Sequence, residues 1–228
     1  MKNANISISL TVVLVLSAGS ANSSSHKPVR SKHKLVPSST TRKPSASTEV
    51  DTWKPDPKLL NNLTGETQVS SYALRLPEGY SEVPQSPEMA ARRQNGFDNH
   101  VYGMSRRSDG TAATLGFVIA TPPSSMAGTL TLDDALDGTL QQKKHQWQDF
   151  TQSPVQDGYI NGLAFKRVYF KGMVSGAAGT RMAHGFAYVA INGNSILSFQ
   201  AEDVEPYNDE TIPVAQAAVL TFHKQATR

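Results

Sequence analysis

Apolar and polar side chains alternate over several stretches of this 228-residue chain, and a period of two is typical of β-strands. In residues 71–80 the alternation places Tyr72, Leu74 and Leu76 on one face, and a Pro-Glu-Gly sequence then interrupts it. The other stretches with strand character are residues 100–123, 158–174, 181–191 and 195–201. In residues 158–174 both faces mix apolar and charged side chains, which predicts a sheet that is partly covered on both sides.

Three dipeptides that favour tight turns interrupt these runs: Asp109-Gly110, Asn161-Gly162 and Asn192-Gly193. Such pairs favour hairpin turns because glycine adopts a positive φ without steric cost. Short turns connect antiparallel strands, whereas parallel strands need long crossovers. The sheet is therefore predicted to be largely antiparallel.

A helical spacing of apolar residues replaces the strand period in two places. In the first, at residues 131–147, the apolar stripe is Leu132, Leu136, Leu140 and Trp147. Thr131 and Asp134 predict a capping box at its start. Cationic side chains near its end suit the helix dipole, and these are Lys143, Lys144 and His145.

The second helix is predicted within residues 205–224. Its apolar stripe is Ile212, Ala215, Val219 and Phe222. Asn208 or Asp209 is expected to cap this helix, with Glu210 in its positive first turn. Pro213 is then expected in the first turn, where a missing N–H is tolerated. The order of strands, helix, strands and helix predicts an α+β fold, a largely antiparallel sheet with helices packed on its faces.

Charge is distributed unevenly between the two ends of the chain. Residues 1–58 hold nine Lys/Arg and three Asp/Glu, a net charge of +6, whereas residues 59–228 hold 13 and 16, a net charge of −3. The high isoelectric point therefore belongs to the N-terminal arm, and specific nucleic-acid binding by the folded part is not expected. The sequence has no cysteine, which excludes disulfides, thiol nucleophiles and Cys-ligated metals.

The N-terminal arm has the composition of an export signal followed by a linker. Residues 1–21 combine Lys2, an apolar run of about 11 residues and small residues before Ala21, which predicts a secretory signal peptide. The run is shorter than the ~20 residues of a membrane-spanning helix, so no stable transmembrane helix is expected after cleavage; an uncleaved anchor is the alternative. Residues 22–65 are rich in Ser, Thr, Pro and Lys/Arg and predict a disordered basic linker. Residues 66–228 are predicted to form a single domain.

Residues 68–224 resemble the PsbP-like group, which includes the bacterial DcrB-type envelope proteins. The resemblance lies in an opening strand YALRLPEGY, a mid-domain helix, a meander punctuated by Gly and Asn, and the closing segment ILSFQAEDVEPYNDETIPVAQAAVLTF. It implies an α/β/α sandwich around an antiparallel sheet. Most members of the group are non-enzymatic, and no functional residue carries over from it.

The candidate chemistry of the chain favours structural roles. His184 is expected as a packed, hydrogen-bonded core or rim group, because no nucleophile or orienting carboxylate has a usable spacing. Calcium binding by the acidic segment, residues 202–210, is not expected, because its spacing differs from that of an EF-hand. His26 and His33 lie in the linker and are expected to be solvated.

Two loops are the candidate contact regions. The first is the Gly-rich segment Gly172–Arg181, which lacks the Lys-Ser/Thr ending of a P-loop and places Ser175 outside any G-x-S-x-G elbow. The second is the turn Arg106–Gly110, where Arg106 and Arg107 are expected to face water.

The sequence predicts no catalytic, cofactor-binding or metal-ligating residue and no cofactor. It predicts an exported protein of the periplasm, cell envelope or extracellular space that acts as a non-catalytic binding or accessory module. The expected partner is a protein or an anionic cell-surface polymer. The alternative is an envelope hydrolase or other enzyme whose site is assembled from distant residues.

Overall fold

The computed structural model of the chain describes residues 53–225 except 86, 88–90, 92–95, 124, 126–127 and 177–178. The predicted signal peptide, residues 1–21, and linker residues 22–52 lie outside this part, as do His26 and His33.

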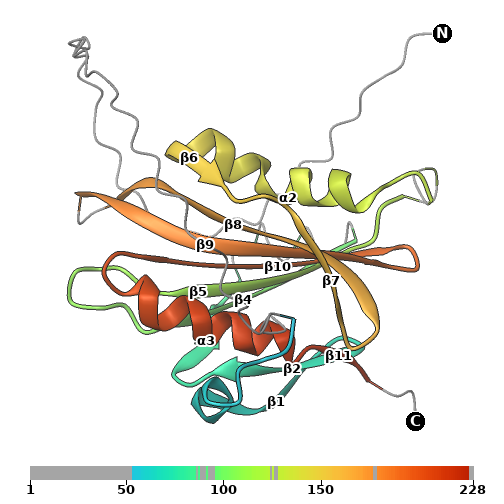
Figure 1. Ribbon diagram of the computed structural model, residues 1–228, viewed down its shortest axis with the longest axis horizontal. Coiled ribbons are helices and arrows are strands. Elements are labelled where there is room, and N and C mark those ends of the chain that lie inside the picture. Colours follow the sequence, from blue (N-terminus) through green and yellow to red (C-terminus); the bar gives the residue numbers. More distant parts are fainter. Residues whose placement is uncertain are drawn as a thin grey trace, which may run out of the picture.

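Eight strands in the described residues form one antiparallel sheet in the order β3-β4-β5-β10-β9-β8-β6, with β7 paired to β8 (Figure 1). Their bounds are β3 (Tyr80–Glu82), β4 (Phe97–Met104), β5 (Thr114–Ala120), β6 (Gln148–Gln152), β7 (Gln156–Ile160), β8 (Leu163–Gly176), β9 (Gly179–Asn192) and β10 (Ser195–Val204). Strands β8 and β9 are each 14 residues long and pair with each other as the longest hairpin of the sheet. The predicted antiparallel sheet is confirmed.

The two faces of this sheet carry different layers (Figure 1). Helix α2 (Leu132–Gln146) packs on one face, against β8 and β9. Helix α3 (Asn208–Leu220) packs on the other, together with the 3-10 helix η1 (Leu59–Asn62). A three-stranded sheet made of β1 (Leu63–Val69), β2 (Tyr72–Pro77) and β11 (His223–Lys224) joins the α3 layer. The α+β prediction is confirmed, although the sequence did not reveal that residues 72–77 belong to a separate small sheet.

Each layer buries its own apolar cluster. On the α3 face, rings from four parts of the chain pack together. Phe117 and Phe199 are stacked with centroids 4.4 Å apart, and the Phe222 centroid lies 5.0 Å from those of both Phe199 and Tyr72. On the α2 face, Leu136, Leu140 and Trp147 are buried, as the helical stripe predicted. Leu132, the first member of that stripe, is only half-buried.

The tight-turn signals had mixed outcomes. Asn161-Gly162 connects β7 and β8 directly, with φ of 47° and 83°, as a two-residue hairpin requires. The turn between β9 and β10 is Gly193-Asn194, one residue later than predicted. Asp109-Gly110 lies within a longer loop, residues 105–113, so it does not join two strands directly.

The two helices begin differently. The capping box of Thr131 and Asp134 is present at the start of α2. At α3 the predicted cap by Asn208 or Asp209 is wrong, because Tyr207 is the N-cap and Thr211 instead anchors the first turn by donating to Asp203.

Pro213 also departs from its predicted place, since it is the sixth residue of α3 and not in the first turn. The missing N–H leaves only the carbonyl group of Asp209 without its usual donor, and Asp209 is exposed, so water can hydrate that group.

The folded domain begins earlier than residue 66. Leu63 is buried, and Leu59 and Leu60 pack against the same cluster on the α3 face. The guanidinium group of Arg75 donates to the carbonyl oxygens of Leu60, Leu63 and Thr64. Residues 53–65, which were assigned to the linker, therefore belong to the domain.

Candidate functional site

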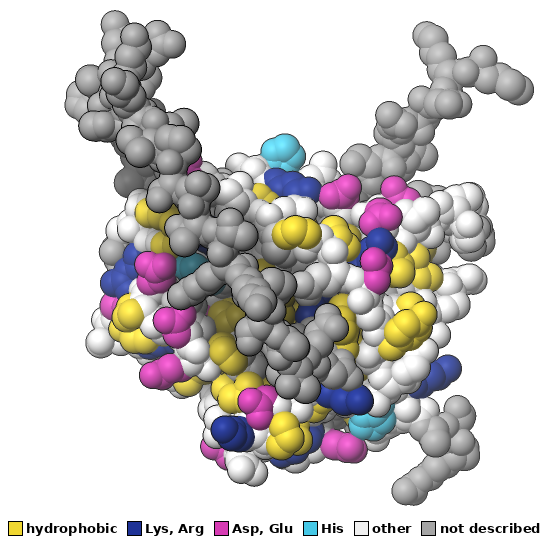
Figure 2. Space-filling model, viewed as in Figure 1, with side chains coloured by type: hydrophobic (Ala, Val, Ile, Leu, Met, Phe, Trp, Pro, Cys, Tyr) yellow, Lys and Arg dark blue, Asp and Glu magenta, His cyan; other side chains and the backbone are white. Residues whose placement is uncertain are grey.

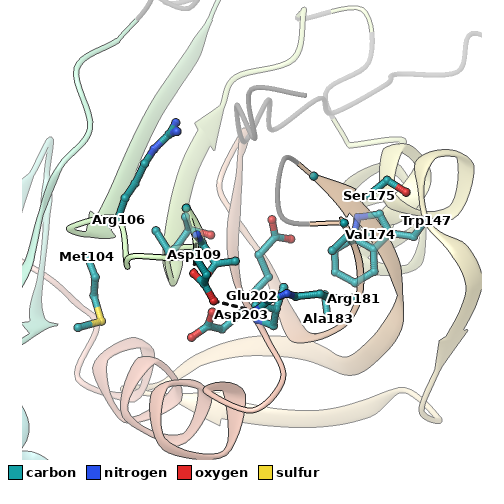
Figure 3. Close-up of a pocket in the computed structure, with 18 of the residues that line it drawn as sticks. Met104, Arg106, Asp109, Trp147, Val174, Ser175, Arg181, Ala183, Glu202 and Asp203 are labelled. Atoms are coloured by element: carbon teal, nitrogen blue, oxygen red, sulfur yellow. Dashed lines mark hydrogen bonds and ion pairs between the residues drawn. The ribbon is translucent and has the colours of Figure 1, made fainter. Parts of the chain in front are cut away.

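A pocket of about 240 Å³ opens on the α2 face of the large sheet, beyond the end of α2 (Figure 3). One side is the β4–β5 loop, residues 105–113, and the other is the β8–β9 hairpin. The sequence predicts both loops as contact regions, and the structure brings them together at one pocket. This pocket is called the hairpin pocket below. Its apolar lining side chains are Val83, Met104, Ala112, Trp147, Val174, Ala183 and Val204.

The floor of the hairpin pocket is formed by adjacent strands whose side chains on the α2 face are not covered by that helix. Thr114 of β5 and Glu202 of β10 lie directly opposite each other in the antiparallel register. Trp147, the residue after α2, lies on one side of the pocket, and Met104 lies on the other (Figure 3).

A buried ion pair joins the β4–β5 loop to β10 behind the hairpin pocket. Arg107 donates to both carboxylate oxygens of Asp203, at 2.8 and 2.6 Å, and the Asp203 side chain has no exposed area. The guanidinium carbon also lies 4.0 Å from the centroid of the Tyr207 ring. The hydrogen bond from Arg107 to Asp203 raises the pKa of Arg107 above its ordinary value. The expectation that Arg107 faces water is therefore wrong, because the bidentate pair draws it inward.

Asp109 and Arg181 form a second pair, between the β4–β5 loop and β9. Arg181 donates to Asp109 at 2.7 Å (Figure 3). The hydroxyl and backbone N–H of Thr111 donate to the other carboxylate oxygen, at 2.6 and 3.0 Å. The hydrogen bonds from Thr111, followed by those from Arg181, hold the pKa of Asp109 well below its ordinary value.

Lys143 and Glu202 form a third pair, at the floor of the pocket. Both side chains are about nine-tenths buried, and the ammonium group donates to Oε2 of Glu202. Lys143 also lies 5.0 Å from the ring centroid of Trp147. Lys143 lies in the last turn of α2, as the sequence predicts, but its buried partner Glu202 had no signal in the sequence.

The three pairs determine what this site can do chemically. Asp109, Glu202 and Asp203 each accept a hydrogen bond from a cation of the same chain, so their charges are compensated within the protein. A general base or an activated nucleophile needs a group that is free to take up a proton and is near a reacting hydroxyl or thiol. The ion-paired carboxylates instead fix the shape of a largely apolar pocket.

His184 and His100 both lie outside the lining of the hairpin pocket. His184 has a side chain 31% exposed, at the rim of the sheet, and its Nε2 lies 2.9 Å from Oε1 of Glu205. His100 on β4 lies beside Glu82 and Asp98, at 3.3 and 3.1 Å. Ser70 donates to Asp98 and not to the imidazole of His100, so these residues do not form the serine–histidine contact of a hydrolase.

Two observations concern membranes and metals. No helix in the described part of the chain is long and apolar enough to cross a membrane. Within residues 53–225, apart from the gaps given above, no three His, Asp or Glu side chains cluster as metal ligands would. The acidic segment, residues 202–210, instead divides its carboxylates among Lys143, Arg107, His184 and the first turn of α3.

The surface chemistry agrees with the charge balance of the folded part. On the face that Figure 2 shows, the acidic and basic side chains of the described residues are interspersed. A nucleic-acid-binding face would gather Lys and Arg into a stripe.

The sequence is matched by no protein-family model and by no curated protein. Among solved structures, its fold is similar to that of cyanobacterial PsbP (CyanoP) from Synechocystis sp. PCC 6803, with a TM-score of 0.50 and 17% identity over 72% of this chain and 92% of that chain. The Ran-binding protein Mog1p of Saccharomyces cerevisiae has a TM-score of 0.44 and 12% identity, covering 72% and 95%. LpqN of Mycobacterium tuberculosis, which is involved in cell envelope biogenesis, has the same TM-score and identity, covering 74% and 95%. The predicted PsbP-like fold is confirmed.

Proposed function

We propose that this chain is an exported, non-catalytic binding module of the cell envelope and that its partner binds at the hairpin pocket. The observation that carries the proposal is the pairing of every carboxylate at the pocket with a cation of the same chain. A catalytic carboxylate would be held free and with an altered proton affinity at the point of reaction. Here the ion pairs hold two loops around an apolar hollow, which suits binding.

The proposal gives the N-terminal arm a separate task. Residues 1–21 direct export, and residues 22–52 form a basic tether that contacts anionic polymer of the cell surface. The arm enters the domain at Trp53, which packs against the α3 face, whereas the hairpin pocket opens on the α2 face. The described chain therefore begins on the layer opposite to the one on which the pocket opens.

The test of the binding site uses a photo-crosslinking amino acid in the native envelope. Ser175 is exposed on the rim of the hairpin pocket, and Glu66 is exposed on the small sheet of the opposite layer. Replacing Ser175 with p-benzoylphenylalanine should yield a discrete adduct that mass spectrometry identifies, whereas the same replacement of Glu66 should not. Equal adducts from both positions, or adducts from Glu66 alone, would contradict the proposed site.

Export and the absence of catalysis are tested separately. The mature protein should be recovered from the envelope fraction with an N-terminus near Asn22, and retention in the cytoplasm would contradict export. Deleting residues 22–52 should abolish retention on anionic wall material. A small-molecule turnover that is lost in His184→Ala or His100→Ala would establish an enzyme instead.

A further inference from the structure

We infer that the hairpin pocket receives a tryptophan or tyrosine side chain of a partner protein. This inference rests on the proposed function and names the chemistry of the partner. Four observations carry it: the way glycines of this sheet seat aromatic rings, the unfilled glycines of the pocket, the residues around them, and two adjacent hydrogen-bonding groups on its floor.

Strand glycines in this fold provide room for aromatic rings of the chain itself. Gly158 on β7 lies under the ring of Trp53, which is so close that a Cβ at position 158 would fall 2.0 Å from it. Gly185 on β9 lies under Phe170, where a Cβ would fall 2.6 Å from the ring. Glycine is disfavoured within strands unless another group approaches the backbone closely. Both of these positions therefore use the missing side chain to bury a ring.

Three strand glycines line the hairpin pocket and seat no ring: Gly103 on β4, Gly176 on β8 and Gly179 on β9. A Cβ at Gly176 or at Gly179 would meet no atom within 4 Å. A Cβ at Gly103 would meet the Val83 side chain, a backbone oxygen and the Thr114 methyl group at 3.4–3.9 Å. The space above them belongs to the 240 Å³ pocket. A cavity of about 150 Å³ is enough to bind benzene, so this pocket has room for a two-ring side chain.

The walls of the pocket favour an aromatic occupant over an aliphatic one. Trp147 lies along one side of the pocket (Figure 3), and pairs of aromatic rings gain more than their buried area alone would give. Arg181 lies at the rim, and guanidinium groups stack on aromatic faces. Two arginines of this chain already make such contacts, most closely Arg107 over Tyr207 at 4.0 Å and Arg167 over Trp53 at 4.3 Å.

The polar groups on the floor of the pocket favour an aromatic ring that carries a hydrogen-bond donor. The hydroxyl of Thr114 is buried and has no partner among the described residues. Glu202 lies opposite it in the register, and Lys143 engages only Oε2, so that Oε1 keeps unused acceptor capacity. Buried polar atoms without a partner are costly, and a ligand that satisfies them is selected over one that does not. The indole N–H of tryptophan and the phenol O–H of tyrosine are such donors, and phenylalanine has none.

The test uses indole and indene, which have the same shape but differ in the N–H group. Binding to the exported form of the chain is followed by NMR chemical shifts, which should change at Trp147, Thr114 and Val174. Indole is expected to bind about tenfold more tightly than indene, the effect of one buried hydrogen bond. Thr114→Val should reduce that difference, because it removes one floor hydroxyl and keeps the side-chain shape. Gly176→Leu should abolish binding of both probes, and Gly65→Leu, which also has open space around its Cβ but lies on β1, should leave binding unchanged.

A second arm distinguishes a protein side chain from a free aromatic compound. The peptide N-acetyl-Ala-Trp-Ala-amide should bind at least as tightly as indole and shift the same residues. Binding of indole without binding of the peptide would assign the pocket to a small molecule and overturn the inference. So would equal affinity for indole and indene, full binding by Gly176→Leu, or no binding of either probe. Crosslinks from Ser175 would in those cases still support the proposed function, so the two failures are distinguishable.

Discussion

At the scale of single residues, the largest difference between the sequence-based prediction and the structure concerns charged side chains, several of which are buried. Arg107, Lys143, Glu202 and Asp203 are all mostly buried, and each compensates the charge of another. A buried ion is costly unless a partner and further hydrogen bonds replace water. The partners are far apart in the sequence, since Arg107 and Asp203 are separated by 96 positions. Sequence reasoning therefore has no local signal for these pairs and assigns such residues to the surface.

Because Arg107 is paired with the buried Asp203, replacing it should destabilise the protein much more than replacing its neighbour Arg106. Arg107→Ala leaves the Asp203 carboxylate buried without its cation and should lower the free energy of unfolding by about 3 kcal/mol. Arg106→Ala changes an exposed side chain, whose polar contacts contribute at most about 1 kcal/mol, and should therefore lower the free energy of unfolding clearly less. Urea unfolding followed by tryptophan fluorescence measures both variants. Equal losses of unfolding free energy in the two variants would show that the Arg107–Asp203 pair adds no stability beyond that of an exposed arginine.

The lowered pKa of Asp109 predicts a loss of stability in acid. A carboxyl group whose pKa is lower in the folded than in the unfolded state contributes stability that is fully present above the unfolded value, here 3.8. That contribution is lost as the pH falls below 3.8 towards the folded value. Thermal unfolding of the protein between pH 2 and pH 6 should therefore show a steeper decline than that of Asp109→Asn. Parallel curves for the two proteins would contradict the role of the hydrogen bonds from Thr111 and of the Arg181 contact.

At the scale of elements, the sequence predicts well where local chemistry determines the structure. The capping box of α2 and the Asn161-Gly162 turn are formed by residues that are neighbours in the chain, and both are confirmed. The small sheet β1-β2-β11 was missed, because β11 contributes only two residues and pairs with β2 across the whole domain. Pro213 was misplaced because the start of α3 depends on the contact of Thr211 with Asp203, which lies on another element.

The capping box offers a prediction at this scale. Thr131→Ala removes the hydroxyl that accepts from the N–H of Asp134, and it should destabilise the domain by about 1 kcal/mol. Thr131→Ser keeps a hydroxyl at the N-cap and should retain most of the stability. Chemical denaturation of both variants measures the difference. A loss in Thr131→Ser as large as that in Thr131→Ala would indicate that the methyl group, and not the cap, is responsible.

At the scale of the whole molecule, the hairpin pocket shows what lies beyond sequence reasoning. The sequence identified both loops that form it, because Gly-rich and Asp-Gly segments indicate exposed turns. That these loops meet depends on the strand order, which places β10 between β5 and β9. The floor residues Thr114 and Glu202 had no signal of their own, since a threonine and a glutamate within strands are unremarkable until the register aligns them.

The N-terminal boundary of the domain predicts how much of the arm the fold requires. Trp53 covers Gly158 and lies under the guanidinium group of Arg167. Its ring also meets that of Tyr188 edge to face, with centroids 5.6 Å apart. Trp53 is therefore part of the α3 layer, although it directly follows the basic arm in the sequence. Trp53→Ala should lower the free energy of unfolding by about 3 kcal/mol, from lost burial and the lost cation–π contact. A chain that begins at residue 53 should match the stability of the exported form in urea, because it keeps Trp53 and every other described member of this core.

A chain that begins at residue 66 should be largely unfolded, since it also lacks Leu63 and η1 and the combined loss approaches the ~5–15 kcal/mol total of an ordinary domain. Arg75 then loses the carbonyl oxygens of Leu60, Leu63 and Thr64 that its guanidinium group binds, so a half-buried cation is left without those acceptors. Circular dichroism and urea titration of the two truncated chains measure the difference. Equal stability of both would mean that residues 53–65 dock on a domain that is already complete, and that Trp53 only fixes where the tether leaves it.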